Sequence, residues 1–467
     1  MAKIYVFGIG GTGSRVLRSL TMLLASGVQC SDAIVPIIID PDASSGEVER
    51  TVNLMQRYAE IRSNLTFDTK QKNNFFRTEI KEIFENFKMP MVRTTDGSFK
   101  DYIDLAGMDI SNRALAEILF SEKNLSSDMK VGFKGNPNIG SIVLNQFEQS
   151  EQFVNFANEF TSEDKIFIIS SIFGGTGASG FPLLLKTLRV GDGVPNKALV
   201  NNAHIGAISI LPYFHVKQDV NSQIDSATFV SKAKAALSYY HRSINSTNDI
   251  DHMYYIADNA CSTYANSEGG QEQKNNAHFV ELAAAMSIVD FANQKKPNSP
   301  VYKEYGIQTD VTSIIYDNLG SETRSICKSM AQFLLFAKYF RENKKDDFLS
   351  KPWVKDRNEM SKLFDKSFFE ELKKLHENFI EWLTEMGDQD RKFKVLKLHT
   401  DKNRVYDILE GKEPKKIWVI DSNFELFNNR LNNQKGEETK NASSEQMLLE
   451  LFYLATAQLV EEKLKTE

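Results

Sequence analysis

The first 260 residues alternate between short apolar runs, mostly β-branched, and longer stretches with apolar residues at helical spacing. Residues 3–7, 34–39 and 165–171 are runs of the first kind, with the length and composition of buried strands. A stretch typical of a helix follows each of them. Strands that alternate with helices predict an α/β domain with a parallel sheet and with its loops at one edge.

The pattern divides the chain of 467 residues into three parts. Residues 1–275 form a predicted first domain of Rossmann type, and residues 44–130 are an insertion within it. Residues 276–294 are apolar along most of one face and form a predicted central helix. Residues 295–467 begin with a segment rich in turn formers and form a predicted second, α+β domain.

The insertion has a helical pattern at residues 48–64 and 71–86, and Gly97 and Gly107 are helix breakers beyond them. Two interpretations stay open. The insertion is a surface that contacts a partner protein or another subunit, or it is a helical excursion that packs on the sheet.

The predicted second domain has helical patterns at residues 323–343 and 364–386 and strand patterns at residues 392–398 and 416–420. A final helix is predicted from Ser444 to Lys465. Its apolar stripe is typical of a helix that packs on its own domain or docks on a neighbouring subunit.

Three glycine-bearing segments stand beside these runs. They read Gly-Ile-Gly-Gly-Thr-Gly-Ser-Arg at residues 8–15, Gly-Asn-Pro-Asn-Ile-Gly at 135–140 and Phe-Gly-Gly-Thr-Gly-Ala-Ser-Gly at 173–180. Glycine between a strand and a helix lets the backbone approach a ligand closely, and the free N–H groups of a helix N-terminus attract anions. One such loop is compatible with a tight turn alone, but three of them indicate a nucleotide site.

These segments resemble the nucleotide loops of the tubulin superfamily, which includes the bacterial cell-division GTPase FtsZ. Residues 135–140 are similar to the Ala-Asn-Pro-Glu-x-Gly of FtsZ, and residues 173–180 to the tubulin signature Gly-Gly-Gly-Thr-Gly-Ser/Thr-Gly. Residues 173–180 differ from this signature in two ways: Phe173 replaces the first Gly, and there is one additional small residue. The resemblance covers about residues 3–315. It implies a tubulin-like GTP-binding fold whose subunits assemble head to tail into cytoskeletal filaments.

The resemblance also implies the residues that hold GTP or GDP and Mg²⁺. Asp40 and Asp42 follow the second predicted strand, and Asp42 would approach Mg²⁺ through water, because this ion prefers oxygen ligands. The residues expected around the phosphates are Gly10, Gly11, Thr12, Gly13, Gly135, Asn136, Pro137, Gly174, Gly175, Thr176, Gly177 and Ala178.

The contacts to ribose and base are carried over in the same way. Gln223 stands near the family's ribose-binding Glu, and Asn259 matches the Asn that reads guanine, where an amide can both donate and accept. Asn276 and His278 are candidates for a second base contact. Asn259 also suits a turn after a strand, and Asn276 and His278 suit a helix cap or the surface.

The match is poorest in the loop that supplies catalytic acids to the next subunit of a filament. By spacing it falls on residues 306–313, where Gln308 replaces Asn, Asp310 is kept and Ser313 stands in place of an acid. A hydroxyl is a much poorer general base than a carboxylate. The resemblance therefore predicts GTP binding with weak or absent hydrolysis.

Composition adds limits on location and partners. The three cysteines are far apart without metal spacing, which is typical of a reducing compartment, and we expect a cytoplasmic protein. The chain starts Met-Ala-Lys and continues directly into a predicted strand, which leaves no room for a signal peptide. No apolar run approaches ~18 residues, the length of a membrane span. A net charge of −6 argues against a general nucleic-acid groove.

Three other functions are compatible with part of the sequence. The first loop also resembles that of ATP-dependent adenylating enzymes, and Asp40 would suit the ribose of a dinucleotide in a dehydrogenase. Neither alternative explains the loops at 135–140 and 173–180. A nucleotide-dependent scaffold or switch that does not polymerise fits the same loops, and Ser313 favours it.

Overall fold

The structure is a computed structural model of the chain. It describes residues 2–464 except 43, 68–71, 92–96, 130–131, 148–149, 192, 220–223, 245–248, 260–261, 268, 307–309, 358, 400–402, 416–422 and 435–442. Within the described residues, no helix is long and apolar enough to cross a lipid bilayer.

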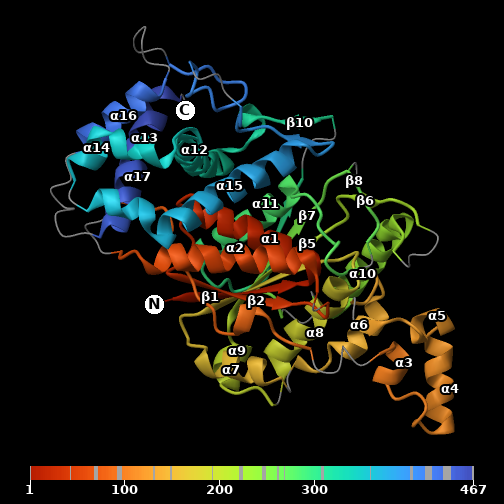
Figure 1. The fold of residues 1–467 in the computed structure, drawn as a ribbon. Helices are drawn as coiled ribbons and strands as arrows, with labels where there is room; N and C mark the ends of the chain where they lie inside the picture. The colour runs from red at the N-terminus through yellow and green to blue at the C-terminus, as the bar shows by residue number, and fades with distance from the viewer. Residues whose placement is uncertain are drawn as a thin grey trace.

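A parallel sheet of seven strands forms the centre of the first half (Figure 1). Its order is β3-β2-β1-β4-β5-β7-β9, and every neighbouring pair is parallel. The strands are β1 (Lys3–Ile9), β2 (Ala33–Ile39), β3 (Glu79–Ile80), β4 (Lys165–Ser171), β5 (His204–Ile210), β7 (His252–Ile256) and β9 (Val301–Tyr305). The predicted α/β class is confirmed.

Helices cover both faces of this sheet, as Figure 1 shows. One face carries α1 (Gly10–Ala25), α2 (Gly46–Ser63) and α11 (Phe279–Asn293). The other carries α6 (Pro137–Val143), α7 (Glu151–Glu159), α8 (Thr176–Val190), α9 (Lys197–Asn201) and α10 (Phe229–Ser243). Because both faces are covered, β1, β2, β4 and β5 are buried almost throughout, which explains their continuous apolar sequences.

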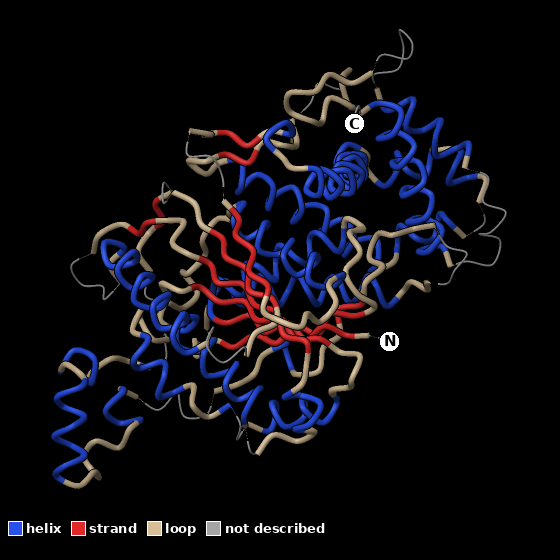
Figure 2. The backbone as a smooth tube through the Cα atoms, turned by 180° about the vertical axis from the view of Figure 1, so that it is seen from behind, coloured by secondary structure: helices blue, strands red, loops and turns tan. Residues whose placement is uncertain are grey.

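A second, mainly helical layer packs on α1 and α2, on the side away from the sheet (Figures 1 and 2). It consists of α12 (Ser321–Glu342), α13 (Lys345–Ser350), α14 (Pro352–Lys355), α15 (Ser367–Gly387), α16 (Phe424–Asn433) and α17 (Ser444–Lys463). Aromatic rings fill its core. Phe336 stacks on Phe452 at 4.3 Å between centroids, and both rings of this pair touch neighbouring aromatic residues.

Four short strands form two small parallel pairs outside the main sheet. β6 (His215–Val216) pairs with β8 (Thr263–Tyr264), and β10 (Ser313–Ile314) pairs with β11 (Lys392–Phe393). Short 3₁₀ helices occupy Glu85–Phe87, Ser226–Thr228, Tyr316–Asn318 and Met360–Asp365.

Part of the insertion projects from the body of the molecule. Its helices are α3 (Phe99–Tyr102), α4 (Ile110–Leu119) and α5 (Glu122–Leu125). Figures 1 and 2 both place α4 at the lower corner of the molecule, away from the sheet. The excursion has a small core of its own, in which Phe99 and Phe120 meet edge to face at 4.9 Å.

Several predicted elements differ from those observed. The helix expected at 71–86 is wrong: Phe75 and Phe76 are buried in the core, and the chain then forms β3 and a 3₁₀ turn. The strand expected at 392–398 is limited to the two residues of β11. The strand expected at 416–420 lies outside the described residues. β9, which follows the turn-rich segment after α11, was not predicted.

Candidate functional site

A cleft lies at the carboxyl end of the sheet, where the loops after β1, β2 and β4 meet. The predicted residues that line it are Gly10, Gly11, Thr12, Asp40, Asp42, Gly135, Gly174, Gly175, Thr176 and Gly177. They come from four separate segments between residues 10 and 177. The fold thus brings the predicted phosphate and Mg²⁺ loops together in one place.

Two helix N-termini meet in this cleft. α1 begins at Gly10 and α8 at Thr176, and a Cβ built on Gly10 lies 3.3 Å from the Cβ of Thr176. Neither helix has a side-chain cap. The first N–H groups of a helix have no partner within it, and the positive ends of two helix dipoles add here. The cleft is therefore suited to an anion such as a phosphate chain.

The glycines of the loops serve different purposes. A Cβ on Gly177 would lie 2.6 Å from the carbonyl oxygen of Ser171, so this glycine lets α8 pack on the strand before it. A Cβ on Gly175 would lie 3.1 Å from the backbone nitrogens of Gly135 and Asn136, so it lets two loops approach each other. Gly11 differs, because a Cβ there meets no atom nearer than 3.9 Å. Its backbone borders open space in the cleft, as contact with a ligand requires.

A buried arginine that the sequence analysis missed stands behind the first loop. Arg15 lines the cleft, and its Nε donates to Oε1 of Glu281 at 2.6 Å. One terminal nitrogen of its guanidinium donates to the hydroxyls of Tyr213 at 2.9 Å and Thr12 at 3.3 Å. Burial by itself would lower the pKa of Arg15, but Tyr213, Glu281 and Glu47 raise it well above the usual value. Arg15 thus stays protonated beside the anion site, with its charge paired to Glu281.

The two acids of the second loop lie side by side. Asp40 accepts a hydrogen bond from the backbone N–H of Asp42, and Asp42 accepts one from the backbone N–H of Gly270 at 2.6 Å. Burial raises the pKa of Asp40 to about 7, and the carboxylate of Asp42 adds to the effect. A pair of carboxylates that repel each other at the edge of a phosphate cleft fits a divalent cation, which would lower that pKa again.

Residues 265–267 and 269–275 connect β8 to α11 and border the cleft, where they pass the start of α2. The carbonyl of Gly270 accepts from Gly46 N–H at 3.0 Å, and the side-chain oxygen of Gln273 lies 4.0 Å from a Cβ built on Gly11. Gln273 and Asn275 line the cleft, and the Gln273 amide lies near the first glycine loop. The aromatic residues Phe173, Phe214 and Phe229 form the wall on the other side.

Other predicted residues lie outside the lining of this cleft. Gly13 packs against Gly8, where a Cβ would meet the Gly8 carbonyl carbon at 2.5 Å. Asn136 and Pro137 begin α6, and Ala178 lies in the first turn of α8. His278 caps α11, and its pKa is lowered to about 3 by burial, Arg15 and Arg391.

The predicted base contacts are the least supported by position. Asn259 and Asn276 are exposed and do not line the cleft, and Gln223 lies outside the described residues. Asn276 uses its carbonyl to accept from the Tyr264 hydroxyl at 3.0 Å. Gln273 and Asn275 gave no signal in the sequence, because they sit in a polar segment without periodicity.

No protein-family model matches the sequence, and no curated protein matches it. Solved structures do match. The chain is similar in structure to FtsZ and CetZ.

The matched structures share few residues with the chain. An FtsZ tryptophan-to-tyrosine mutant from M. jannaschii is 16% identical over 55% of this chain and 46% of that one, with a TM-score of 0.28. CetZ2 from Haloferax volcanii, a GTPγS-bound protofilament, is 14% identical over 62% and 58%, with a TM-score of 0.30. CetZ from Methanosaeta thermophila is 16% identical over 62% and 51%, with a TM-score of 0.23. The match spans about half the length of these FtsZ and CetZ chains, and it says nothing of the activity of this one.

The described residues of the segment expected to supply catalytic residues follow the last strand of the sheet. That strand, β9, is parallel to β7, so Asp310 comes after the same end of the sheet as the glycine loops. Gln308 lies outside the described residues, and Ser313 begins β10. The catalytic roles of Gln308 and Asp310 stay predictions.

Proposed function

We propose that the chain is a cytoplasmic, tubulin-like protein that binds GTP and Mg²⁺ in the cleft, self-associates head to tail when nucleotide is bound, and hydrolyses GTP weakly or not at all. The observation that carries the proposal is the meeting of two uncapped helix N-termini beside Gly11, whose backbone borders open space.

In this proposal each part of the cleft has one task. The backbone N–H groups at the starts of α1 and α8 hold the phosphates. Asp42, with Asp40 beside it, holds the water shell of Mg²⁺, which neutralises phosphate charge when it is bound. Arg15 adds a fixed positive charge, and the amides of Gln273 and Asn275 supply paired donors and acceptors for the base.

Weak hydrolysis follows from the loop after β9. Asp310 belongs to the same end of the sheet as the cleft, and Ser313 lacks a carboxylate. A hydroxyl at Ser313 is a much poorer general base than the carboxylate expected there. The same observation favours a second candidate function, a nucleotide-dependent scaffold or switch for a partner protein that does not polymerise.

Titration calorimetry with GTP and ATP, each with Mg²⁺, tests the proposal. We expect GTP to bind more tightly. Gly11→Leu should abolish binding without unfolding the protein, because a Cβ there lies no nearer than 3.9 Å to another atom and the rest of the side chain would occupy the cleft. Thr176→Phe should also abolish binding, because the ring would block the approach of phosphate to the backbone N–H groups. Lys186→Phe, at an exposed position of α8, is the control. Equal or tighter ATP binding would favour an adenylating enzyme, and unchanged binding in Gly11→Leu would show that the loops are turns only.

A further inference from the structure

Arg15 lies in the second turn of α1, and its side chain turns back over the first glycine loop. Side chains of a helix lean towards its N-terminus, so Arg15 covers the turn that holds Gly11, four residues earlier. The residue is only 3% exposed, yet it lines the cleft. The fold thus places a buried arginine against the part of the cleft where the backbone of Gly11 borders open space.

The guanidinium of Arg15 has five N–H groups, and three of them have a partner in the protein. Nε donates to Glu281, and Nη2 donates to the hydroxyls of Tyr213 and Thr12. Among the residues that the structure describes, Nη1 has no hydrogen-bond partner. This nitrogen lies 3.9 Å from a Cβ built on Gly11, so it borders the open space beside that glycine. A donor held in such a place costs free energy until it is paired, and an acceptor on a ligand would pair it.

A phosphate group is the acceptor that fits this place best. Hydrogen bonds between a guanidinium and a phosphate are charge-assisted, and they are stronger than those between neutral groups. The starts of α1 and α8 bring the positive ends of two helix dipoles to the same part of the cleft. The nearby acids Glu281 and Glu47 offset the charge of Arg15. The contribution of Arg15 is therefore a directed hydrogen bond rather than an excess of positive charge.

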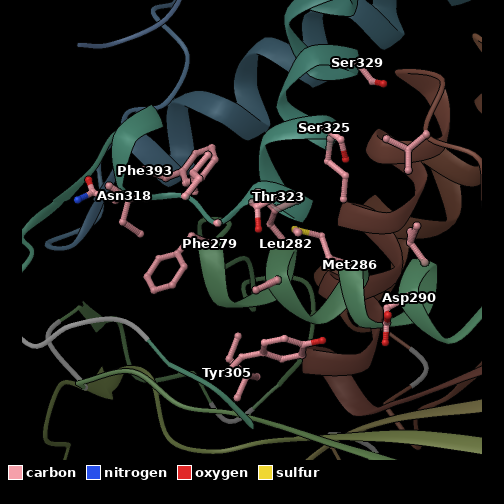
Figure 3. Close-up of a pocket in the computed structure, with 18 of the residues that line it drawn as sticks. Phe279, Leu282, Met286, Asp290, Tyr305, Asn318, Thr323, Ser325, Ser329 and Phe393 are labelled. Carbon is pink, nitrogen blue, oxygen red and sulfur yellow. The ribbon is translucent and has the colours of Figure 1, made fainter. Parts of the chain in front are cut away.

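Other places in the molecule suit this anion less well. A cavity of about 930 Å³ runs along α11, where Figure 3 shows Leu282, Met286 and Asp290. Within the described part of the chain, the charged residues that line this cavity are Asp290 and Asp317, which repel an anion. Lys134 also lines the nucleotide cleft, but it is only half-buried and belongs to the turn before α6. Arg15 is the basic residue of the cleft whose geometry is fixed by burial and by an ion pair.

We propose that Nη1 of Arg15 donates to a phosphate group of the bound nucleotide beside Gly11. This inference rests on the proposed function, and it assigns to Arg15 a direct and directional contact with the ligand. Glu281 and Tyr213 are then positioning residues, because they hold the guanidinium through its other nitrogens. A lysine at this position would keep the charge but lack the planar fork, so its single nitrogen could not serve Glu281 and the phosphate together.

Calorimetry with GTP and with inorganic pyrophosphate, each with Mg²⁺, tests this inference in the Arg15→Lys variant. We expect both probes to bind more weakly by about tenfold or more, because the contact is made to phosphate and not to the base. Arg18→Lys is the matched control. Arg18 lies on the same helix, is 4% exposed and pairs with Glu385, but it is not part of the cleft lining. Urea unfolding without nucleotide should show similar losses of stability in the two variants, whereas the affinities should fall only in Arg15→Lys.

Tyr213→Phe provides a second, milder variant, since it keeps the buried ring and removes only one acceptor of the guanidinium. It should fold normally and bind pyrophosphate about threefold more weakly. Unchanged pyrophosphate affinity in Arg15→Lys or Tyr213→Phe, or an equal loss in Arg18→Lys, would overturn the inference.

The two probes also separate this inference from the proposed function. Pyrophosphate binding that depends on Arg15, without a preference for GTP over ATP, would refute the proposed nucleotide and support the phosphate contact. GTP binding that is tighter than ATP binding but unchanged in Arg15→Lys would support the proposed function and refute the contact. An unmodified protein that binds neither GTP nor pyrophosphate would refute both.

Discussion

The guanidinium of Arg15 donates to the carboxylate of Glu281 at 2.6 Å, and both side chains are almost fully buried. Arg15 lies in α1 just after the first glycine loop, and Glu281 lies in the first turn of α11. The ion pair links the cleft at the glycine loops to the first turn of α11. A change in the cleft that displaces Arg15 therefore acts directly on α11.

Removing one partner of this ion pair should destabilise the protein. Glu281→Leu leaves a buried guanidinium without its carboxylate, and we expect the free energy of unfolding to fall by about 3–5 kcal/mol. The double variant Arg15→Met with Glu281→Leu should recover part of that loss, because neither member of the ion pair is then left buried without the other, although buried Glu47 loses its interaction with Arg15. Urea unfolding of the two single variants and the double variant measures the coupling energy between Arg15 and Glu281. If the losses of the two single variants simply add in the double variant, the two side chains are not coupled.

Asp40 should make the protein less stable as the pH rises. Its pKa is about 7 in the folded state, against 3.8 ordinarily, so the folded state keeps a proton that the unfolded state has lost. The contribution of Asp40 to stability is full below pH 3.8 and is lost as the pH rises through 7. Between pH 5 and 8 the loss is about 3 kcal/mol.

The Asp40→Asn variant isolates this effect. Its stability relative to the unmodified protein should increase from pH 5 to pH 8, as measured by thermal or urea unfolding. Mg²⁺ should bind the unmodified protein more weakly below pH 7, where Asp40 is protonated. A pH profile identical in both proteins would place the pKa of Asp40 in its ordinary range.

His376 should make the protein less stable as the pH falls. It is buried among Phe333, Phe336 and Phe340, and neither ring nitrogen has a hydrogen-bond partner. Burial lowers its pKa to about 3, so below pH 6.5 the unfolded state takes up a proton that the folded state does not. From pH 8 to pH 5 this lowers stability by about 2 kcal/mol.

His376→Phe should remove that loss and gain stability at both pH values, since an unpaired buried polar group costs about 1–3 kcal/mol. Chemical unfolding at pH 5 and pH 8 gives the comparison. If the variant is less stable than the unmodified protein at pH 5, the histidine has a partner or fills its site better than phenylalanine.

GTP turnover should be low and should not rise with protein concentration. Because the loop after β9 lies at the same end of the sheet as the cleft, we expect Asp310→Asn and Ser313→Glu to change turnover by less than about twofold. Phosphate release over a hundredfold range of protein concentration provides the measurement. A rise in turnover with assembly that Asp310→Asn abolishes would restore the head-to-tail catalytic role.

The parts of the fold that the sequence predicted are those with local signals. Strands such as β1 and β4 are buried on both faces and therefore apolar throughout, and glycine is needed where Gly10 takes a φ of +71°. The edge strand β9 was missed because it reads Val-Tyr-Lys-Glu-Tyr after a proline-rich turn. Such a sequence is as typical of a linker as of a strand.

The missing parts of the site depend on partners that are remote in the chain. Arg15 and Glu281 are 266 residues apart, and Asp42 meets Gly270 across 228 residues. Neither contact leaves a periodic or composition signal. The glycine loops were recognised because each is complete within a few residues, whereas the contacts that bring residues 270–275 to the cleft are not.

β9 has a consequence for how the protein avoids aggregation. An outermost strand offers a row of backbone groups to which strands of other molecules can add. Lys303 and Glu304 put charges in the middle of this strand, and at the far edge β3 has only two residues. Both edges of the sheet are thus poor templates for the addition of a strand from another molecule.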